Sequence, residues 1–384
     1  MRNAQRRKPT RVSAHTPTAV IYCEANFGAA DGKTANGLVR QSDTYKIVSV
    51  IDSKQAGLDA GEVLGGVRNG IAVHADLAEA VASAGSVPDA FIFGIAPASG
   101  LLSVHERGVV LEAMAMGMDV VSGLHEFLGD DPVFIAAQAA HHVTIRDVRR
   151  PPDKKDLRLF DGRIASVTCP RIAVLGTDCA IGKRTTATIL TRALNERGIA
   201  AVMIATGQTG LIQGARYGVA LDAMPSQFCA GEVEGAVVEA YEAEHPDVII
   251  IEGQSALGHP AYLSSGFILR GAQPEAVILQ HAPARTMRCD FGGLPVPSPA
   301  AEINLIETFA DTKVIGLTIN HEGMTDAEIT AAIILYEFEL GIPVTDALAR
   351  PTDELVDMAL RALPGIAESA EGASDDLPVP AAAG

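Results

Sequence analysis

The chain has 384 residues, a formal net charge of -17 and an apolar share of 48%. This length suits two domains, because single hydrophobic cores seldom grow beyond about 250 to 300 residues. The acidic balance argues against a nucleic-acid partner, since neutralising phosphates takes a concentrated basic surface. An anionic substrate remains compatible with it, because a local cationic pocket can form within an acidic protein.

Cysteine usage and hydropathy indicate the compartment. The five cysteines form no CxxC pair and lack the histidine spacing of a zinc site, so we expect reduced thiols. No apolar run reaches the ~18 residues of a membrane span. The basic start of the chain has no apolar segment behind it. We therefore expect a cytoplasmic protein with neither a membrane nor a nucleic acid as partner.

The first half of the chain alternates between two kinds of segment. Apolar, β-rich runs predict strands, and apolar residues at helical spacing predict helices. The expected strands are residues 18–24, 46–52, 90–96 and 119–125, and the expected helices are 77–85 and 106–118. Such an order is typical of a right-handed parallel sheet and predicts an α/β fold. With no Trp, the cores must consist mainly of Ala, Val, Ile and Leu, as in sheets buried on both faces.

A boundary is expected at residues 149–156, where charged residues accompany two prolines. Beyond it the strand pattern restarts, with expected strands at 171–176, 200–207, 247–253, 276–282 and 313–320. We therefore predict one parallel-sheet domain at 18–150 and another at 165–366. The tails at 1–17 and 367–384 are expected to be disordered, since the second is poor in large apolar residues.

The stretch "GTDCAIGKRTTA", residues 176–187, predicts a phosphate-binding loop. It lies between an apolar strand and a helix, where backbone N–H groups and the helix N-terminus form an anion site. Five residues separate the first glycine from the GK pair, one more than in the standard P-loop, and this longer form resembles the loop of dethiobiotin synthetase. The expected cofactor-binding residues are Gly176, Thr177, Asp178, Cys179, Ala180, Ile181, Gly182, Lys183, Arg184, Thr185 and Thr186.

Arg184 stands where a Ser or Thr normally holds magnesium. A guanidinium can neutralise phosphate directly and bidentately, so we expect no firm metal site. If Mg²⁺ is used, Thr185 and Glu252 are the expected ligands. We interpret Cys179 as a small residue where the backbone approaches phosphate, rather than as a nucleophile.

Polar residues follow several predicted strands, at the edge where α/β sheets bind ligands. Glu252 ends one strand in the manner of a Walker-B carboxylate, and His259 follows it after a short loop. Asn320 ends another strand, at a position that contacts adenine in several proteins of this nucleotide-binding fold. The remaining candidates at this edge are Gln208, Thr209, His281 and Arg285.

The loop at residues 25–40 carries Gly28, Gly32, Lys33, Thr34 and Arg40 after the first strand. It is compatible with a second anion site or with a surface turn leading into an N-capped helix. The residues do not decide between these two interpretations.

Five peptides together carry a resemblance: residues 25–40, 176–187, 205–210, 250–262 and 278–285. From about residue 18 to about 365 the chain resembles a bacterial and archaeal P-loop family that includes D-glutamate N-acetyltransferases. The resemblance implies a P-loop NTPase-like domain after a Rossmann-like domain, the latter similar to the CoA-binding domain of succinyl-CoA synthetases. It also implies acetyl-CoA as cofactor, D-glutamate as substrate in D-glutamate catabolism, and a dehydrogenase acting on N-acetyl-D-glutamate as functional partner. A homo-oligomer is expected.

For this reaction, Glu252, His259 and Lys183 are the expected catalytic residues, with Glu252 or His259 as base. Gln208, Thr209, His281 and Arg285 are expected to bind substrate, Arg285 through a carboxylate. One alternative is an ATP-dependent enzyme that activates a carboxylate, of ligase or kinase-like type, using ATP and Mg²⁺. Another is a regulatory module that senses a nucleotide without turnover.

Overall fold

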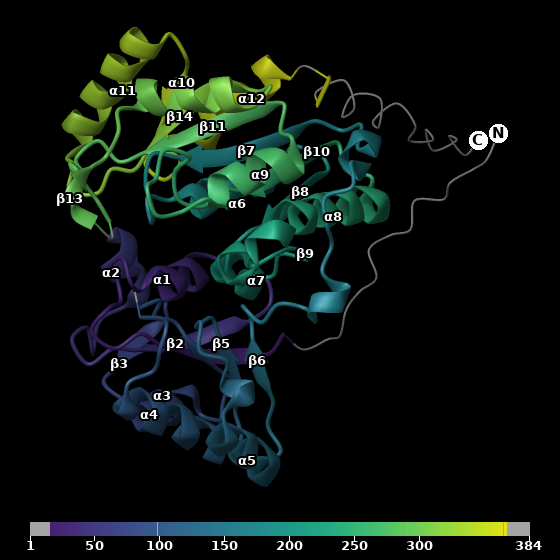
Figure 1. The fold of residues 1–384 in the computed structure, drawn as a ribbon. Helices are drawn as coiled ribbons and strands as arrows, with labels where there is room; N and C mark the ends of the chain where they lie inside the picture. The colour runs from purple at the N-terminus through teal and green to yellow at the C-terminus, as the bar shows by residue number, and fades with distance from the viewer. Residues whose placement is uncertain (1–15, 98, 290, 364, 367–384) are drawn as a thin grey trace, which may run out of the picture. The chain divides into compact units, whose positions relative to one another are not determined.

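The computed structural model describes residues 16–97, 99–289, 291–363 and 365–366. Apart from residues 16–17, the tails predicted at 1–17 and 367–384 lie outside this range. The described residues divide into two compact units, of which the first comprises residues 16–97, 101–122 and 128–147. The second comprises the described residues of 99–100, 123–127 and 148–366. Each unit is built on a parallel sheet, which confirms the predicted α/β class (Figure 1).

The first unit contains a six-stranded sheet in the order β3-β2-β1-β4-β5-β6. Every neighbouring pair is parallel, and this order is that of a Rossmann fold. The strands are β1 (Thr18–Tyr22), β2 (Lys46–Ile51), β3 (Ala72–His74), β4 (Ala90–Phe93), β5 (Asp119–Ser122) and β6 (Ile145–Asp147). The four strands predicted here are confirmed as β1, β2, β4 and β5, whereas β3 and β6 are too short for a clear periodicity.

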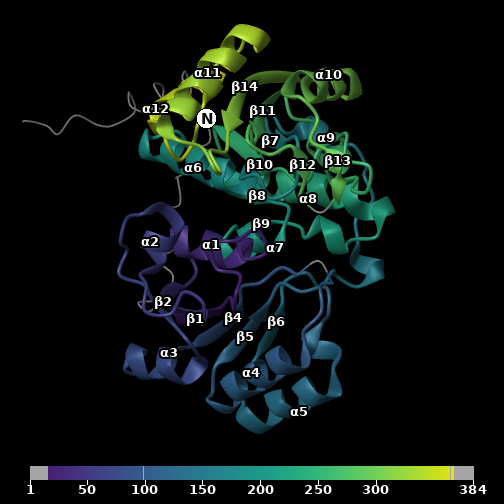
Figure 2. The ribbon, with the colours of Figure 1, turned by 90° about the vertical axis from the view of Figure 1, so that its left-hand side faces the viewer.

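Helices cover both faces of this sheet. They are α1 (Lys33–Arg40), α2 (Ala60–Gly65), α3 (Leu77–Ala84), α4 (Val104–Ala115) and α5 (Pro132–His141), with the 3-10 turn η1 (Leu128–Asp130). Figures 1 and 2 show α1 and α2 on one side of the strands and α3, α4 and α5 on the other. This cover explains why β4 is buried along its whole length.

The loop between β1 and α1 is held by Asp52, the residue after β2. Its carboxylate accepts hydrogen bonds from the backbone N–H groups of Ala25 at 3.1 Å, Phe27 at 2.9 Å and Lys54 at 2.9 Å. Gly32, which has no side chain, is the N-cap residue of α1, so no side-chain hydrogen bond caps the start of this helix.

The second unit contains a seven-stranded sheet in the order β15-β14-β11-β7-β10-β8-β9, again parallel throughout. Its strands are β7 (Arg171–Gly176), β8 (Ala201–Ala205), β9 (Tyr217–Gly218), β10 (Val248–Glu252), β11 (Ala276–His281), β14 (Lys313–Ile319) and β15 (Val344–Thr345). An antiparallel hairpin of β12 (Met287–Arg288) and β13 (Phe291–Pro295) follows β11. The five strands predicted in this half are confirmed as β7, β8, β10, β11 and β14.

The helices of this unit are α6 (Lys183–Glu196), α7 (Gln208–Gln213), α8 (Ser226–Glu244), α9 (Ser264–Ala272), α10 (Pro299–Phe309), α11 (Asp326–Leu340) and α12 (Thr352–Ala362). Short 3-10 turns are η2 (Lys154–Asp156), η3 (Arg163–Ser166) and η4 (Leu221–Ala223). In the part of the chain that the structure describes, no helix combines the length and apolar character that crossing a bilayer requires.

The core of the second unit has two halves, one on each face of the sheet. Along β10, Ile249 and Ile251 pack with residues of α8 and α9, whereas Val248 and Ile250 pack with residues of α6 and α12. Because side chains alternate between faces and both faces are covered, every residue of β10 is apolar until Glu252. Strand β10 thus carries its polar residue, Glu252, at its carboxyl end.

Candidate active site

The phosphate-binding loop joins β7, the central strand, to α6. Gly182, the residue before α6, has φ +106°, and Ala180 has φ +49°, so both lie in the left-handed region. Gly182 caps α6 without a side-chain hydrogen bond, and the first turn of α6 has no acidic residue. No capping side chain therefore competes with an anion for the positive end of the helix dipole.

Gly176 is required where the loop leaves β7. A Cβ at this position would lie 2.8 Å from Ile181 Cδ1 and 2.9 Å from the carbonyl oxygen of Gln280. The Gln280 carbonyl also accepts a hydrogen bond from the Thr177 amide at 3.1 Å. The start of the loop is therefore pinned against β11, the neighbouring strand.

Lys183 folds back over the loop from the first turn of α6. Its Nζ donates a hydrogen bond to the carbonyl oxygen of Asp178 at 2.5 Å, and the residue is buried. A bound phosphate is the usual partner of a lysine at this position of a P-loop.

Arg184 contacts protein hydroxyl and amide groups. Its Nη1 donates to Oε1 of Gln213 at 2.6 Å, and its Nη2 donates to the Thr185 hydroxyl at 3.2 Å. The Thr186 hydroxyl donates to Oε1 of Gln280 at 2.6 Å. Both threonine hydroxyls after the lysine are therefore engaged by protein groups.

Glu252 ends β10, next to β7, and its carboxylate is buried. Its Oε2 accepts a hydrogen bond from the Thr206 amide at 3.0 Å. Burial raises the pKa of Glu252 to about 7, although the charge of Arg184, the Thr206 and Gly207 amides and the charge of Lys183 act in the opposite direction. This carboxylate can therefore exchange a proton near neutral pH.

Gln208 and Thr209 begin α7, directly after β8, and both are buried. Glu252 packs against this helix, since a Cβ on Gly210 would lie 2.7 Å from its Oε2. The first turn of α7 and the end of β10 thus meet at one edge of the sheet, as the sequence predicted from the strand order.

His259 is buried in an aromatic setting. Its ring stacks on Tyr262 with centroids 4.6 Å apart and lies 5.4 Å from the ring of Phe291. The Ala261 amide donates to its Nδ1 at 3.1 Å, so a neutral ring carries its proton on Nε2.

Asp178, Cys179 and His259 form a group of possible metal ligands within the described ranges, with one ligand atom of each within 4.8 Å of the others. Oδ1 of Asp178 is buried and accepts no hydrogen bond from the described residues. A histidine that ligates a metal usually donates its second N–H, whereas Nδ1 of His259 accepts one. This tautomer suits a hydrogen-bond donor near the loop better than a metal ligand.

His281, the last residue of β11, supports the loop. Its Nδ1 lies 2.8 Å from the Thr177 hydroxyl, and its ring meets Tyr336 edge-on with centroids 5.6 Å apart. Burial lowers the pKa of His281 to about 4, so the ring is neutral at pH 7.

Arg285 also contacts the loop. Its Nη1 donates to Oδ2 of Asp178 at 3.0 Å and to the Cys179 carbonyl at 2.7 Å. Its Nε and Nη2 donate to the two carboxylate oxygens of Glu322 at 2.7 and 2.9 Å. Burial opposes the charge, but the bonds to Glu322 and Asp178 outweigh it and raise the pKa of Arg285. The sequence assigned this guanidinium to a substrate carboxylate, whereas here it binds two protein carboxylates.

Asn320, after β14, reaches the same loop. Its Nδ2 donates to the Ile181 carbonyl at 3.1 Å, and its Oδ1 accepts from the Glu322 amide at 3.0 Å. The expected adenine contact at Asn320 stays a prediction.

Two charged residues of this site were not recognised in the sequence. Arg288, in β12, is buried and donates to the carbonyl oxygens of Thr177 and Gly258. Glu302, in α10, is buried and accepts from the Leu257 amide at 2.6 Å and the Gly258 amide at 3.2 Å. Neither residue ends a strand of the seven-stranded sheet. The criterion that identified Glu252, a polar residue at the end of a predicted strand, therefore did not select them.

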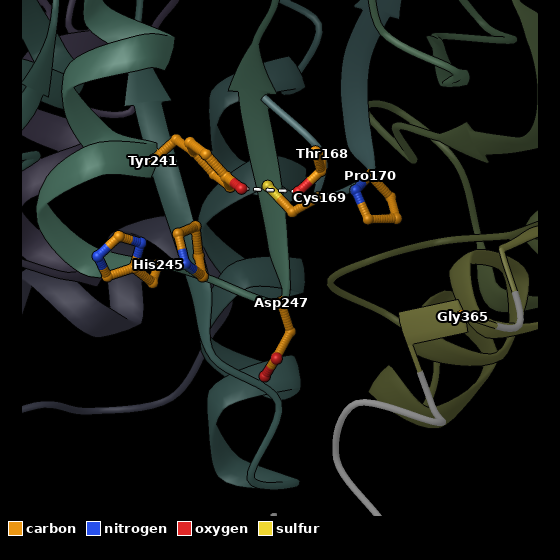
Figure 3. Close-up of a pocket in the computed structure, with 8 residues that line it drawn as sticks. Thr168, Cys169, Pro170, Tyr241, His245, Asp247 and Gly365 are labelled. Carbon is orange, nitrogen blue, oxygen red and sulfur yellow. Dashed lines mark hydrogen bonds between the residues drawn. The ribbon is translucent and has the colours of Figure 1, made fainter. Parts of the chain in front are cut away.

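A separate pocket of about 420 Å³ lies at the opposite edge of the sheet, lined by residues 168–170 and 245–247 with Tyr241 and Gly365 (Figure 3). Pro170 and Asp247 directly precede β7 and β10. The pocket therefore adjoins the amino ends of strands whose carboxyl ends carry the loop and Glu252. Ligands of parallel α/β sheets bind at the carboxyl ends, so this pocket is not part of the candidate site.

Comparison with known proteins places the chain in a family. The profile described as "Domain of unknown function (DUF1611_C) P-loop domain" matches residues 158–356, and that of the DUF1611_N Rossmann-like domain matches residues 53–151. The chain is 33% identical over 273 residues to a protein of Tritonibacter scottomollicae named D-glutamate N-acetyltransferase, covering 69% of this chain and 79% of that protein. The chain belongs to the DUF1611 family.

A protein of the same name from a Pseudoalteromonas species is 31% identical over 273 residues, covering 69% of this chain and 80% of that one. The crystal structure of a DUF1611 family protein from Anabaena variabilis superposes with a TM-score of 0.82 at 31% identity, covering 90% of this chain and 99% of that one. The resemblance seen in the sequence, and the Rossmann-like and P-loop domains that it implied, are therefore confirmed.

Proposed function

We propose that this DUF1611 protein is a D-glutamate N-acetyltransferase that uses acetyl-CoA. The observation that carries the proposal is the buried carboxylate of Glu252, whose pKa of about 7 suits a general base beside a phosphate-binding loop. The names of the two relatives, each at least 31% identical, supply the acetyl donor and the acceptor. Their level of identity supports an enzyme of this class without fixing its substrate.

The loop fits the phosphates of coenzyme A. Gly182 and the uncapped start of α6 form the anion site, and Lys183 and Arg184 supply two positive charges. Arg184 can neutralise a phosphate oxygen where a P-loop NTPase would use a metal ion. Acetyl-CoA, when bound, supplies an acetyl thioester to the site.

In the proposed reaction the α-ammonium of D-glutamate loses a proton to Glu252 and becomes a nucleophilic amine. The amine nitrogen forms a bond to the acetyl carbon, and the bond from that carbon to sulfur breaks. The nitrogen then loses a second proton, which the CoA thiolate takes up, so the products are N-acetyl-D-glutamate and the CoA thiol. No hydrolysis of a phosphoanhydride is required, so the loop serves only to bind the phosphates of coenzyme A.

Mass spectrometry of D-glutamate incubated with the protein and acetyl-CoA tests this proposal. The expected product is heavier by one acetyl group, and free thiol appears in equal amount without ATP. The main alternative is an ATP-dependent ligase, which would release ADP or phosphate and would need Mg-ATP. Binding of either cofactor without any product would instead indicate a regulatory module.

A further inference from the structure

We propose that Arg288 binds a carboxylate of the acceptor amino acid. The proposal rests on the function proposed above, which requires a site for an acceptor with two carboxylates. The sequence predicts this role for Arg285, but the two arginines have different contacts in the structure.

Arg288 differs from the other buried arginines in its partners. Among the described residues, the arginines classed as buried are Arg149, Arg171 and Arg288, which are 5%, 8% and 7% exposed. Arg149 pairs with Asp222 at 2.8 Å, and Arg171 pairs with Glu275. No carboxylate of the described residues lies within ion-pair distance of the Arg288 guanidinium, whose acceptors are two backbone carbonyls.

The charge of Glu302 acts on Arg288 through space, but no described carboxylate contacts its guanidinium. A buried guanidinium that no carboxylate contacts is costly, and proteins usually pair such a cation or place it where a ligand supplies the carboxylate. Arg288 donates to the Thr177 carbonyl at 3.4 Å, which is long for an N–H···O bond, and to the Gly258 carbonyl at 3.2 Å, the upper end of the usual range. A guanidinium has five N–H groups, so most of its donors remain for a ligand. A carboxylate matches this planar fork bidentately.

The contacts of Arg288 also fix its place in the site. Thr177 belongs to the phosphate-binding loop, and Gly258 directly precedes His259. Glu302 holds the same segment by accepting hydrogen bonds from the Leu257 and Gly258 amides. The guanidinium is therefore held between the proposed cofactor loop and the segment that follows β10. A carboxylate of an acceptor bound there would meet a guanidinium whose position is already fixed.

Arg285 is less suited to bind a substrate carboxylate. Its guanidinium is occupied by Asp178, Glu322 and the Cys179 carbonyl, so a substrate carboxylate would have to displace a protein carboxylate. The two arginines are three residues apart, and only Arg288 makes no ion pair with a carboxylate of the described residues.

Calorimetric titration with glutarate, a five-carbon dicarboxylate without an amine, tests the assignment directly. In Arg288→Met we expect the affinity for glutarate to fall at least tenfold, and in Arg288→Lys we expect a smaller loss. In both variants the affinity for acetyl-CoA should change less than twofold. Arg192→Met is the matched control, because Arg192 is an exposed residue of α6 that pairs with Glu196, and it should change neither affinity.

Thermal unfolding separates a ligand-binding role from a structural one. Because Arg288 makes no ion pair with a described carboxylate, Arg288→Met should change the melting temperature little, whereas replacing a structural arginine would lower it. Arg288→Lys keeps the charge and serves as the second variant if Arg288→Met does not fold.

Unchanged glutarate affinity in a folded Arg288 variant would overturn the assignment. A loss of acetyl-CoA affinity with glutarate unaffected would equally overturn it, since Arg288 would then bind a cofactor phosphate. Failure of the wild type to acetylate D-glutamate would contradict the proposed function, whereas glutarate binding reports on Arg288 alone. The two proposals can therefore fail independently.

Discussion

Nη1 of Arg285 lies 3.0 Å from Oδ2 of Asp178, and so ties the segment after β11 to the phosphate-binding loop. The other side of the same guanidinium binds both oxygens of Glu322. Asp178 is fully buried, and Oδ2 also accepts from the Cys289 amide at 2.8 Å. The conformation of the loop thus depends on residues that lie far from it in the sequence.

We therefore expect Arg285→Lys to weaken cofactor binding rather than substrate binding. A lysine cannot hold Asp178, the Cys179 carbonyl and Glu322 at once, so the loop should lose part of its support. Steady-state kinetics should show a higher KM for acetyl-CoA with little change in that for D-glutamate. The opposite pattern would restore Arg285 as the residue that binds the substrate carboxylate.

Lys183→Ala should reduce cofactor affinity and leave the fold intact. Loss of a charge-assisted contact to phosphate costs on the order of 1.5 to 3 kcal/mol, or at least tenfold in affinity. Separate titrations with acetyl-CoA and ATP measure this effect, with circular dichroism as the control for folding. Unchanged affinity for both compounds would remove the loop from the ligand site.

Chelation should leave the acetylation rate nearly unchanged. Arg184 engages the Thr185 hydroxyl, and Gln280 engages the Thr186 hydroxyl, so neither threonine is arranged to hold a magnesium ion. The measurement is the initial rate with and without EDTA. Activity lost and then restored by Mg²⁺ would favour the ATP reaction and make Glu252 a metal ligand. Restoration by Zn²⁺ alone would point to Asp178, Cys179 and His259.

The acetylation rate should rise with pH through about 7, the pKa to which burial raises Glu252. The base must be ionised to accept the proton of the ammonium group, and below this pH most of it is protonated. Glu252→Gln should lower the rate by a factor of about 10² to 10⁴ and abolish this limb of the pH profile. A profile that keeps the limb in the variant would identify another group as the base.

The same pKa shift predicts the effect of Glu252 on stability. In the folded protein the carboxyl group holds its proton up to about pH 7, whereas its ordinary pKa is 4.5, so the folded state binds more protons between these values. Stability should therefore fall as pH rises from about 4.5 to 7 and stay lower above 7. In Glu252→Gln this fall should disappear, as urea unfolding at pH 5 and pH 8 can show.

Much of the fold and part of the site could be predicted from the sequence, because they depend on local patterns. Apolar runs mark β7 and β10, and the glycine-rich stretch between β7 and α6 has the spacing of a phosphate-binding loop. A parallel sheet brings the ends of its strands to one edge. Glu252 and Gln208 could therefore be assigned to that edge without any knowledge of their contacts.

The charge state and partners of each side chain were decided only by the tertiary structure. Arg285 pairs with a carboxylate 107 residues before it and with another 37 residues after it, and no local pattern reports such distances. His281 is a candidate for substrate binding because it lies at the end of a predicted strand, but only the structure shows that burial lowers its pKa to about 4. Arg288, three residues beyond Arg285, makes no ion pair with a described residue. Periodicity and spacing determine which segments meet, whereas desolvation and ion pairing depend on every neighbour that the fold brings within a few ångströms.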